Sequence, residues 1–232
     1  MPTLIDRSTR PLQVLLIDDH QLLAHAVAIA LRLESVQATL ADLNSPDSII
    51  ASVRADPPDL VLLDLCLGEG PSDGLVDGAA LVRPLTDAGT RVLVLTGTTD
   101  RCWLASAVEA GAIGVLSKAD SLDDVVVAIL KAASGDEVMS GEDRCAMLAE
   151  LHEAREQRER AQEPFRRLTS RERQVLRALG RGKTVPGIAQ EWVVSEATVR
   201  SQVRGVLTKL GVRSQLEAVA CALRSGWLTS VD

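Results

Sequence analysis

Five polar residues that could do chemistry together stand at or just after the ends of short apolar segments. Asp18 and Asp19 close the first such segment and Asp64 closes the third, while Thr96 closes the fourth and Lys118 follows the fifth. If these segments are strands of one doubly wound sheet, all five residues meet at a single edge of it. Three carboxylates in one place repel each other unless a cation lies among them, and oxygen ligands of this kind suit Mg²⁺.

The lysine and the threonine add what a phosphoryl group needs, namely a point charge and a hydrogen-bond donor. The set therefore predicts phosphoryl transfer onto a carboxylate. Each residue alone has a simpler explanation, because an aspartate after a strand is usually a turn residue or a helix N-cap. The prediction depends on all five residues standing at the correct strand ends.

The elements that must position these residues are visible as alternating patterns in the first half of the chain. Continuous apolar runs at 12–17, 60–63, 92–95 and 113–116, with a weaker one at 36–41, are typical of strands buried on both faces of a parallel sheet. Helical patterns lie between or after them at 20–33, 46–55, 79–88, 101–110 and 121–134. This alternation predicts an α/β fold, a doubly wound five-stranded parallel sheet of the flavodoxin-like kind.

The rest of the chain has helical signals only. Residues 142–160 are densely charged and predict a helical or partly frayed linker that ends near Pro164. Four shorter helices follow, and capping boxes at Thr169 and Ser214 open the first and the last of them. Short helices joined by tight turns favour a small all-α helix-turn-helix domain. We therefore expect domains at 11–135 and 167–228, joined by a linker at 136–166.

Charge separates the two halves. The chain has 232 residues, enough for two domains, and a net charge of −7. Residues 1–149 hold 10 Lys/Arg and 22 Asp/Glu (net −12), whereas residues 164–232 hold 12 and 5 (net +7). A basic segment of this size is what binding to a phosphate backbone requires. Charge alone is explained equally well by a surface that only keeps the protein in solution.

Cysteine usage and the chain start point to a cytoplasmic protein. The four cysteines, at positions 66, 102, 145 and 221, form no CxxC pair, so we expect neither a zinc site nor a disulfide framework. The first eleven residues have no apolar region typical of a signal peptide. The longest uncharged apolar-rich stretch, 20–31, is too short to span a membrane.

Residues 11–134 resemble the receiver domains of two-component response regulators. The matching pieces are LLIDDH, LVLLD, VLVLTG and GVLSK. The resemblance implies that Asp64 is the phosphoacceptor, with a sensor histidine kinase as phosphodonor. It also implies that Thr96 donates to the phosphoryl oxygens and that Lys118 pairs with them. Its implied Mg²⁺ ligands are Asp18, Asp19, Asp64 and the backbone carbonyl of Cys66.

Two features around this predicted site differ from the usual receiver pattern, and the role of one further residue, His20, has to be assigned. Val115 and Leu116 stand where receivers usually carry an aromatic switch residue. The loop after the phosphoacceptor is longer than usual and lacks the common proline, and either Gly74 or Gly78 could be its glycine. His20 follows Asp-Asp in many family members, and we expect it to open the first helix.

Residues 168–222 resemble the LuxR-type helix-turn-helix of the NarL/FixJ family. The matching pieces are LTSRE, the IA pair, SEATV and KLGVRS. The resemblance implies that Arg200, Ser201 and Arg204 contact bases and that Lys209 and Arg213 could reach phosphates. One apolar stripe at helical spacing predicts the core side of this helix, namely Val199, Val203, Val206, Leu207 and Leu210.

The final helix, about 214–225, has two open roles. In this family it usually forms the dimer contact, but its apolar residues are equally well explained as domain core; they are Leu216, Val219, Ala220 and Leu223. Ala197 and Gln202 replace the family's frequent Lys and His, which predicts weaker binding per half-site.

The leading hypothesis is a phosphorylation-regulated DNA-binding transcription regulator that binds DNA as a homodimer. One alternative is a regulator whose receiver only dimerises, without a phosphate switch. Another is a Mg²⁺-dependent phosphohydrolase with an aspartate nucleophile. Such enzymes need a second aspartate two residues after the nucleophile, where this chain has Cys66. We therefore expect no enzyme.

Overall fold

The computed structural model describes residues 10–68 and 76–228. The chain divides between Leu151 and His152 into two compact units, which are described separately. In the described residues, no helix is both long enough and apolar enough to cross a membrane.

The first unit is built on the predicted five-stranded parallel sheet. Its strand order is β2-β1-β3-β6-β7, and every neighbouring pair is parallel. The strand bounds are Gln13–Ile17 (β1), Gln37–Leu40 (β2), Leu60–Leu63 (β3), Arg91–Thr96 (β6) and Gly114–Ser117 (β7). The order reverses between β1 and β3, which is where α/β sheets of this type place their sites.

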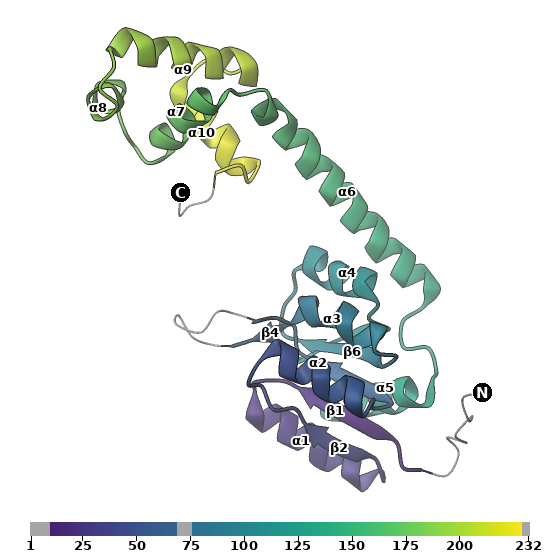
Figure 1. The fold of residues 1–232 in the computed structure, drawn as a ribbon. Helices are drawn as coiled ribbons and strands as arrows, with labels where there is room; N and C mark the ends of the chain where they lie inside the picture. Colours follow the sequence, from purple (N-terminus) through teal and green to yellow (C-terminus); the bar gives the residue numbers. More distant parts are fainter. Residues whose placement is uncertain (1–9, 69–75, 229–232) are drawn as a thin grey trace, which may run out of the picture. The chain divides into compact units, whose positions relative to one another are not determined.

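Helices cover both faces of this sheet (Figure 1). On one face lie α1 (Gln21–Leu33) and α5 (Leu122–Ser134). On the other lie α2 (Pro46–Ala55), α3 (Gly78–Asp87) and α4 (Arg101–Ala110). All four residues of β3 are buried because helices pack on both sides of it, which is why its sequence shows no polar alternation.

The loop after β3 contains a feature that the sequence did not predict. Cys66–Leu67 (β4) and Val76–Asp77 (β5) form a short antiparallel pair. Gly74 lies outside the described residues, but Gly78 packs against backbone, where a Cβ would overlap the carbonyl oxygen of Asp64. The position that needs glycine beside Asp64 is therefore Gly78.

The second unit is helical, and α6 (Gly141–Arg166) runs into it across the boundary between the units. The helix ends near Pro164 as expected, at Arg166. Phe165 holds this last turn, since it is 1% exposed and its ring stacks on Trp227 at 5.2 Å. Near a helix end a proline removes only one hydrogen bond, which such packing outweighs.

Four helices follow α6 in the described chain, at the predicted places: α7 (Ser170–Gly180), α8 (Val185–Glu191), α9 (Glu196–Leu210) and α10 (Gln215–Arg224). The capping box at Thr169 is confirmed, with both reciprocal bonds present. The one at Ser214 is only half formed, because the Glu217 carboxylate accepts from the N–H of Arg213 instead.

Candidate functional site

The carboxyl ends of four strands bring the five predicted residues to one edge of the sheet. Asp18 and Asp19 follow β1, and Asp64 follows β3. Thr96 is the last residue of β6, and Lys118 directly follows β7. The hydrogen-bond ladder between β1 and β3 continues one residue past β3, since the N–H of Asp64 donates to the carbonyl oxygen of Ile17 at 2.8 Å.

Lys118 is the centre of the acidic group. Its Nζ lies 2.7 Å from Oδ2 of Asp64 and 2.9 Å from Oδ1 of Asp18. The side chains of Asp64 and Asp18 are 1% and 8% exposed, and that of Lys118 is 14% exposed. Burial by itself lowers the pKa of Lys118, but the hydrogen bonds to Asp64 and Asp18 outweigh it and raise the pKa. The ammonium therefore stays charged at neutral pH.

Backbone amides hold the remaining carboxylate oxygens in place. Oδ1 of Asp64 accepts from the N–H of Cys66 at 3.1 Å, and Oδ2 of Asp19 accepts from the N–H of Gly68 at 2.8 Å. The loop after β3 thus fixes the orientation of both aspartates.

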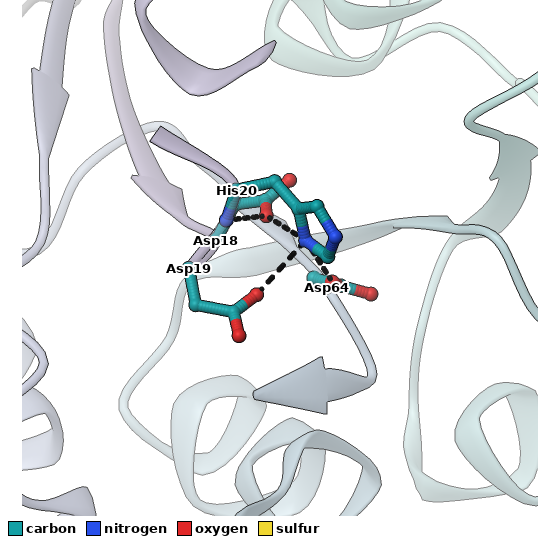
Figure 2. A group of neighbouring side chains, drawn as sticks. All are labelled: Asp18, Asp19, His20 and Asp64. Atoms are coloured by element: carbon teal, nitrogen blue, oxygen red, sulfur yellow. Dashed lines mark hydrogen bonds and ion pairs between the residues drawn. The ribbon is translucent and has the colours of Figure 1, made fainter. Parts of the chain in front are cut away.

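His20 belongs to this site as well, which the sequence analysis missed. It stands at the N-cap of α1, as expected, but its side chain makes no cap bond. Figure 2 shows its ring turned toward the three aspartates. Nδ1 lies 3.0 Å from Oδ1 of Asp19 and 3.1 Å from Nζ of Lys118. The only sequence signal for this placement is its position directly after Asp-Asp.

Thr96 joins the group through Cys66. The threonine is 2% exposed, and its hydroxyl accepts from the N–H of Thr98 at 3.4 Å and acts on the pKa of the Cys66 thiol. Burial raises the pKa of that thiol, as does the charge of Asp64, while the Thr96 hydroxyl and Lys118 lower it. The net shift is upward, so the thiol stays protonated at neutral pH.

The donor set at this edge fits a hard divalent cation. One potential ligand atom from each of Asp18, Asp19, His20 and Asp64 lies within 4.8 Å of the others. Three of the four are carboxylate oxygens, the ligands that Mg²⁺ prefers.

A second candidate surface lies on α9, in the other unit. Arg200, Ser201 and Arg204 are exposed on one side of this helix. Nη2 of Arg200 lies 3.0 Å from Oε2 of Glu196, and both side chains are largely exposed. The predicted core stripe is confirmed on the opposite side, where Val199, Val203 and Val206 are buried and Leu207 and Leu210 are half-buried.

An open groove runs between α8 and α9 beside these arginines. Its lining mixes basic, polar and apolar residues, namely Lys183, Thr184, Val185, Arg200, Val203, Arg204, Leu207 and Gln215. Lys183 forms an ion pair with Glu191.

The two residues expected at phosphates have different surroundings. Arg213 is exposed, two residues after the Gly211 C-cap of α9. Nζ of Lys209 instead lies 2.6 Å from Oε2 of Glu172, a buried residue of α7. Lys209 therefore has a partner inside its own domain.

The structure places some of the apolar residues of α10 against the core and leaves others exposed. Its core-facing residues are Ala218 and Ala222, which are fully buried. Leu216 is 80% exposed and Leu223 is 48% exposed. These two leucines therefore lie outside the core of the domain, whereas Val219 packs against the core and Ala220 is half-buried. Core packing thus explains only part of this set, and the dimer contact stays a prediction.

Comparison with known proteins finds a family for each half of the chain. The family model "Response regulator receiver domain" matches residues 14–130, and "Bacterial regulatory proteins, luxR family" matches residues 166–222. The Mycobacterium tuberculosis protein named "Probable transcriptional regulatory protein NarL" is 31% identical over 207 residues, which cover 89% of this chain and 91% of that protein.

The Haemophilus influenzae "Nitrate/nitrite response regulator protein homolog" is 32% identical over 207 residues, covering 89% of this chain and 94% of its own. Among solved structures, the signal receiver domain of the M. tuberculosis response regulator NarL is 28% identical, covers 54% of this chain and 98% of its own, and has a TM-score of 0.45.

Fold and sites together define a signalling protein with an acidic receiver edge and a helix-turn-helix domain. The chain belongs to the two-component response regulators that carry a LuxR-type domain, a family of DNA-binding transcription regulators.

Proposed function

We propose that Asp64 is the phosphoacceptor and that its phosphorylation controls DNA binding by α9. The observation that carries this proposal is the position of Lys118, whose ammonium bridges Asp64 and Asp18 at the edge of the sheet. A buried carboxylate beside a fixed cation is oriented for attack, and the same cation can accept the charge of the transferred group.

The transfer itself is a displacement at phosphorus. A carboxylate oxygen of Asp64 forms a P–O bond while the bond from phosphorus to the donor breaks, a P–N bond when the donor is the phosphohistidine of a sensor kinase. Lys118 then pairs with the phosphoryl oxygens, and the hydroxyl of Thr96 donates to them.

Magnesium is the cofactor that this site would take. Asp18, Asp19 and Asp64 would hold it, together with the backbone carbonyl of Cys66, and when bound it supplies positive charge against the phosphoryl oxygens.

The residue at position 66 supports regulation over catalytic turnover. A hydrolase of the aspartate-nucleophile class needs a carboxyl group at position 66, where this chain has a thiol with a raised pKa. Val115 and Leu116 offer no aromatic ring to Thr96, so the signal must leave the site by another route than a rotating aromatic side chain.

The output is sequence-specific DNA binding by a dimer, in the cytoplasm where the DNA is. Arg200, Ser201 and Arg204 face outward on α9 and can reach base edges in the major groove, and Arg213 can reach a phosphate. The exposed leucines of α10 fit a contact between two copies, which places two recognition helices on one face of the DNA.

The test is labelling by a small phosphodonor. Wild-type protein is incubated with radiolabelled acetyl phosphate and Mg²⁺, beside D64N and the matched control D47N, which removes the charge of an exposed aspartate on α2. We expect label on the wild type and on D47N, none on D64N, and loss of label when EDTA removes the metal. Full labelling of D64N would contradict the assignment. An unlabelled wild type would favour the regulator without a phosphate switch.

A further inference from the structure

A buried carboxylate joins the first helix of the DNA-binding unit to its recognition helix. Oε2 of Glu172, on α7, accepts from the N–H of Thr169 and from Nζ of Lys209 on α9, both at 2.6 Å. The side chain of Glu172 is 8% exposed. Burial by itself raises the pKa of Glu172, but the bonds from Lys209 and Thr169 outweigh it and lower the pKa. The carboxylate is therefore charged at neutral pH.

Gly205 lets this carboxylate lie directly on the backbone of α9. A Cβ at that position would overlap Oε1 of Glu172. Glycine inside a helix is unfavourable, so its presence in the middle of α9 has a physical reason only where something approaches this closely. Gly205 and Lys209 are four residues apart and share a helix face. Glu172 thus contacts α9 at two points one turn apart.

The surroundings of Lys209 differ from those expected for a lysine that contacts a DNA phosphate. Such a lysine keeps its ammonium in water at the end of a flexible stem. The side chain of Lys209 is 33% exposed, and its ammonium is committed to a carboxylate inside the domain. A phosphate that drew the ammonium away from this pair would leave Glu172 charged and buried, which is costly.

We propose that Glu172, Lys209 and Gly205 form a clamp that fixes the rotation and axial position of α9, so that Lys209 and Glu172 are positioning residues for DNA reading and not DNA contacts. The proposal rests on the base contacts proposed above for Arg200 and Arg204. Arg204 directly precedes Gly205, so a small rotation of the helix at the clamp moves its guanidinium out of bidentate geometry. Recognition groups tolerate only about 0.5 Å and 10–20° of such movement.

The direction in which one substitution changes DNA affinity distinguishes this clamp from a phosphate contact. DNA is an anion, so removing an acidic charge from the binding domain and releasing Lys209 should strengthen binding if Lys209 reaches a phosphate. If the clamp positions α9, E172Q should weaken binding instead. Glu196 provides the matched control, because E196Q makes the same charge change in an exposed pair with Arg200 on the same helix.

The experiment uses the full chain and two duplexes of equal length. One is the sequence that the wild type selects from a random library, and the other is its scrambled version. Fluorescence anisotropy gives Kd for the wild type, E172Q, K209M, the double variant and E196Q. We expect E172Q and K209M each to weaken the selected duplex about tenfold and the scrambled one less than about twofold. The double variant should be no worse than either single one, because both break one clamp. E196Q should bind as tightly as the wild type or more tightly.

Other results would overturn the clamp. If E172Q binds both duplexes more tightly while K209M weakens both equally, Lys209 is a phosphate contact. Partial unfolding lowers the active fraction, so Kd is taken only on protein titrated as active. G205A keeps both charges, and unchanged selectivity in this variant would also contradict the proposal. A wild type that selects no sequence would overturn the proposed DNA reading itself, a failure separate from that of the clamp.

Discussion

Each unit of this protein contains one lysine that ties together elements far apart in the sequence. In the receiver, Lys118 binds Asp64, which lies 54 positions away, and Asp18. In the DNA-binding unit, Lys209 binds Glu172, which lies 37 positions away. Both lysines are mostly buried, and both pairs are short.

The surrounding charge makes the two pairs different. Lys118 faces an excess of carboxylates, because Asp19 belongs to the same group as Asp18 and Asp64. That excess leaves negative charge for a metal ion to neutralise, and so makes the edge a place for chemistry. Lys209 faces a single carboxylate whose other bonds go to the start of α7, so its charge is already balanced. A balanced pair of this kind can hold elements in position but offers no reactive group.

The largest effect should come from removing the lysine of the unbalanced site. K118M leaves buried carboxylates without their cation, and breaking a buried pair in this way costs about 3 kcal/mol. Urea unfolding in EDTA, followed on the receiver, measures this loss, and added Mg²⁺ should restore part of it. The control is K131M, an exposed lysine on α5, which should change stability by less than about 0.5 kcal/mol. Equal stability of the two variants would show that the acidic edge does not depend on Lys118.

On the DNA side, the next largest effect should come from the exposed arginines. R200A and R204A should each cost about 1–3 kcal/mol in binding and relax the preference at one position per half-site. R213A should weaken all sequences alike, because a phosphate contact carries no base information. Binding-site selection with each variant measures both outcomes. If R200A and R204A select the wild-type motif unchanged, α9 docks differently from the proposal.

Much of the fold, and the position of Asp64 in it, could be predicted because both depend on patterns between residues close in the sequence. The run at 60–63 shows no polar alternation because β3 is buried on both faces, and this also fixes where Asp64 lies. The N-caps at Ser121 and Thr169 are visible because a capping residue and its partner are three positions apart. A short spacing rule finds any feature of this kind.

What the sequence could not provide depends on contacts between distant elements. The ring of His20 turns toward the aspartates only because β1 and β3 are neighbours and Lys118 comes from β7. The family resemblance implied that Lys209 could reach a phosphate, and its own helix contains nothing that shows Glu172 beside it. The β4–β5 pair is two residues long on each side, which is too short to produce a pattern.

The smallest effect concerns backbone strain, which also differs between the two units. Ser35 and Val193 both adopt positive φ, at 63° and 55°. Val193 follows the C-cap of α8 at a position that usually has glycine or asparagine, and the next N–H, of Val194, donates back to Ala189 at 3.0 Å. Left-handed backbone is more costly for a β-branched side chain than for serine. The side chain of Val193 is also 90% exposed, so it gains little from packing.

We therefore expect V193N to stabilise the DNA-binding unit by about 1 kcal/mol, and S35N to stabilise the receiver by less. Tryptophan fluorescence follows the two units during unfolding when Trp103, or the pair Trp192 and Trp227, is replaced by Phe, because Trp103 lies in the first unit and the other two in the second. Measuring the DNA affinity of V193N as well as its stability shows whether Val193 has a role in DNA binding. If V193N is more stable and binds DNA as the wild type does, the valine is only strained. If it is more stable but binds less tightly, the exposed valine contributes to the DNA surface, and the strain in this turn is maintained for recognition.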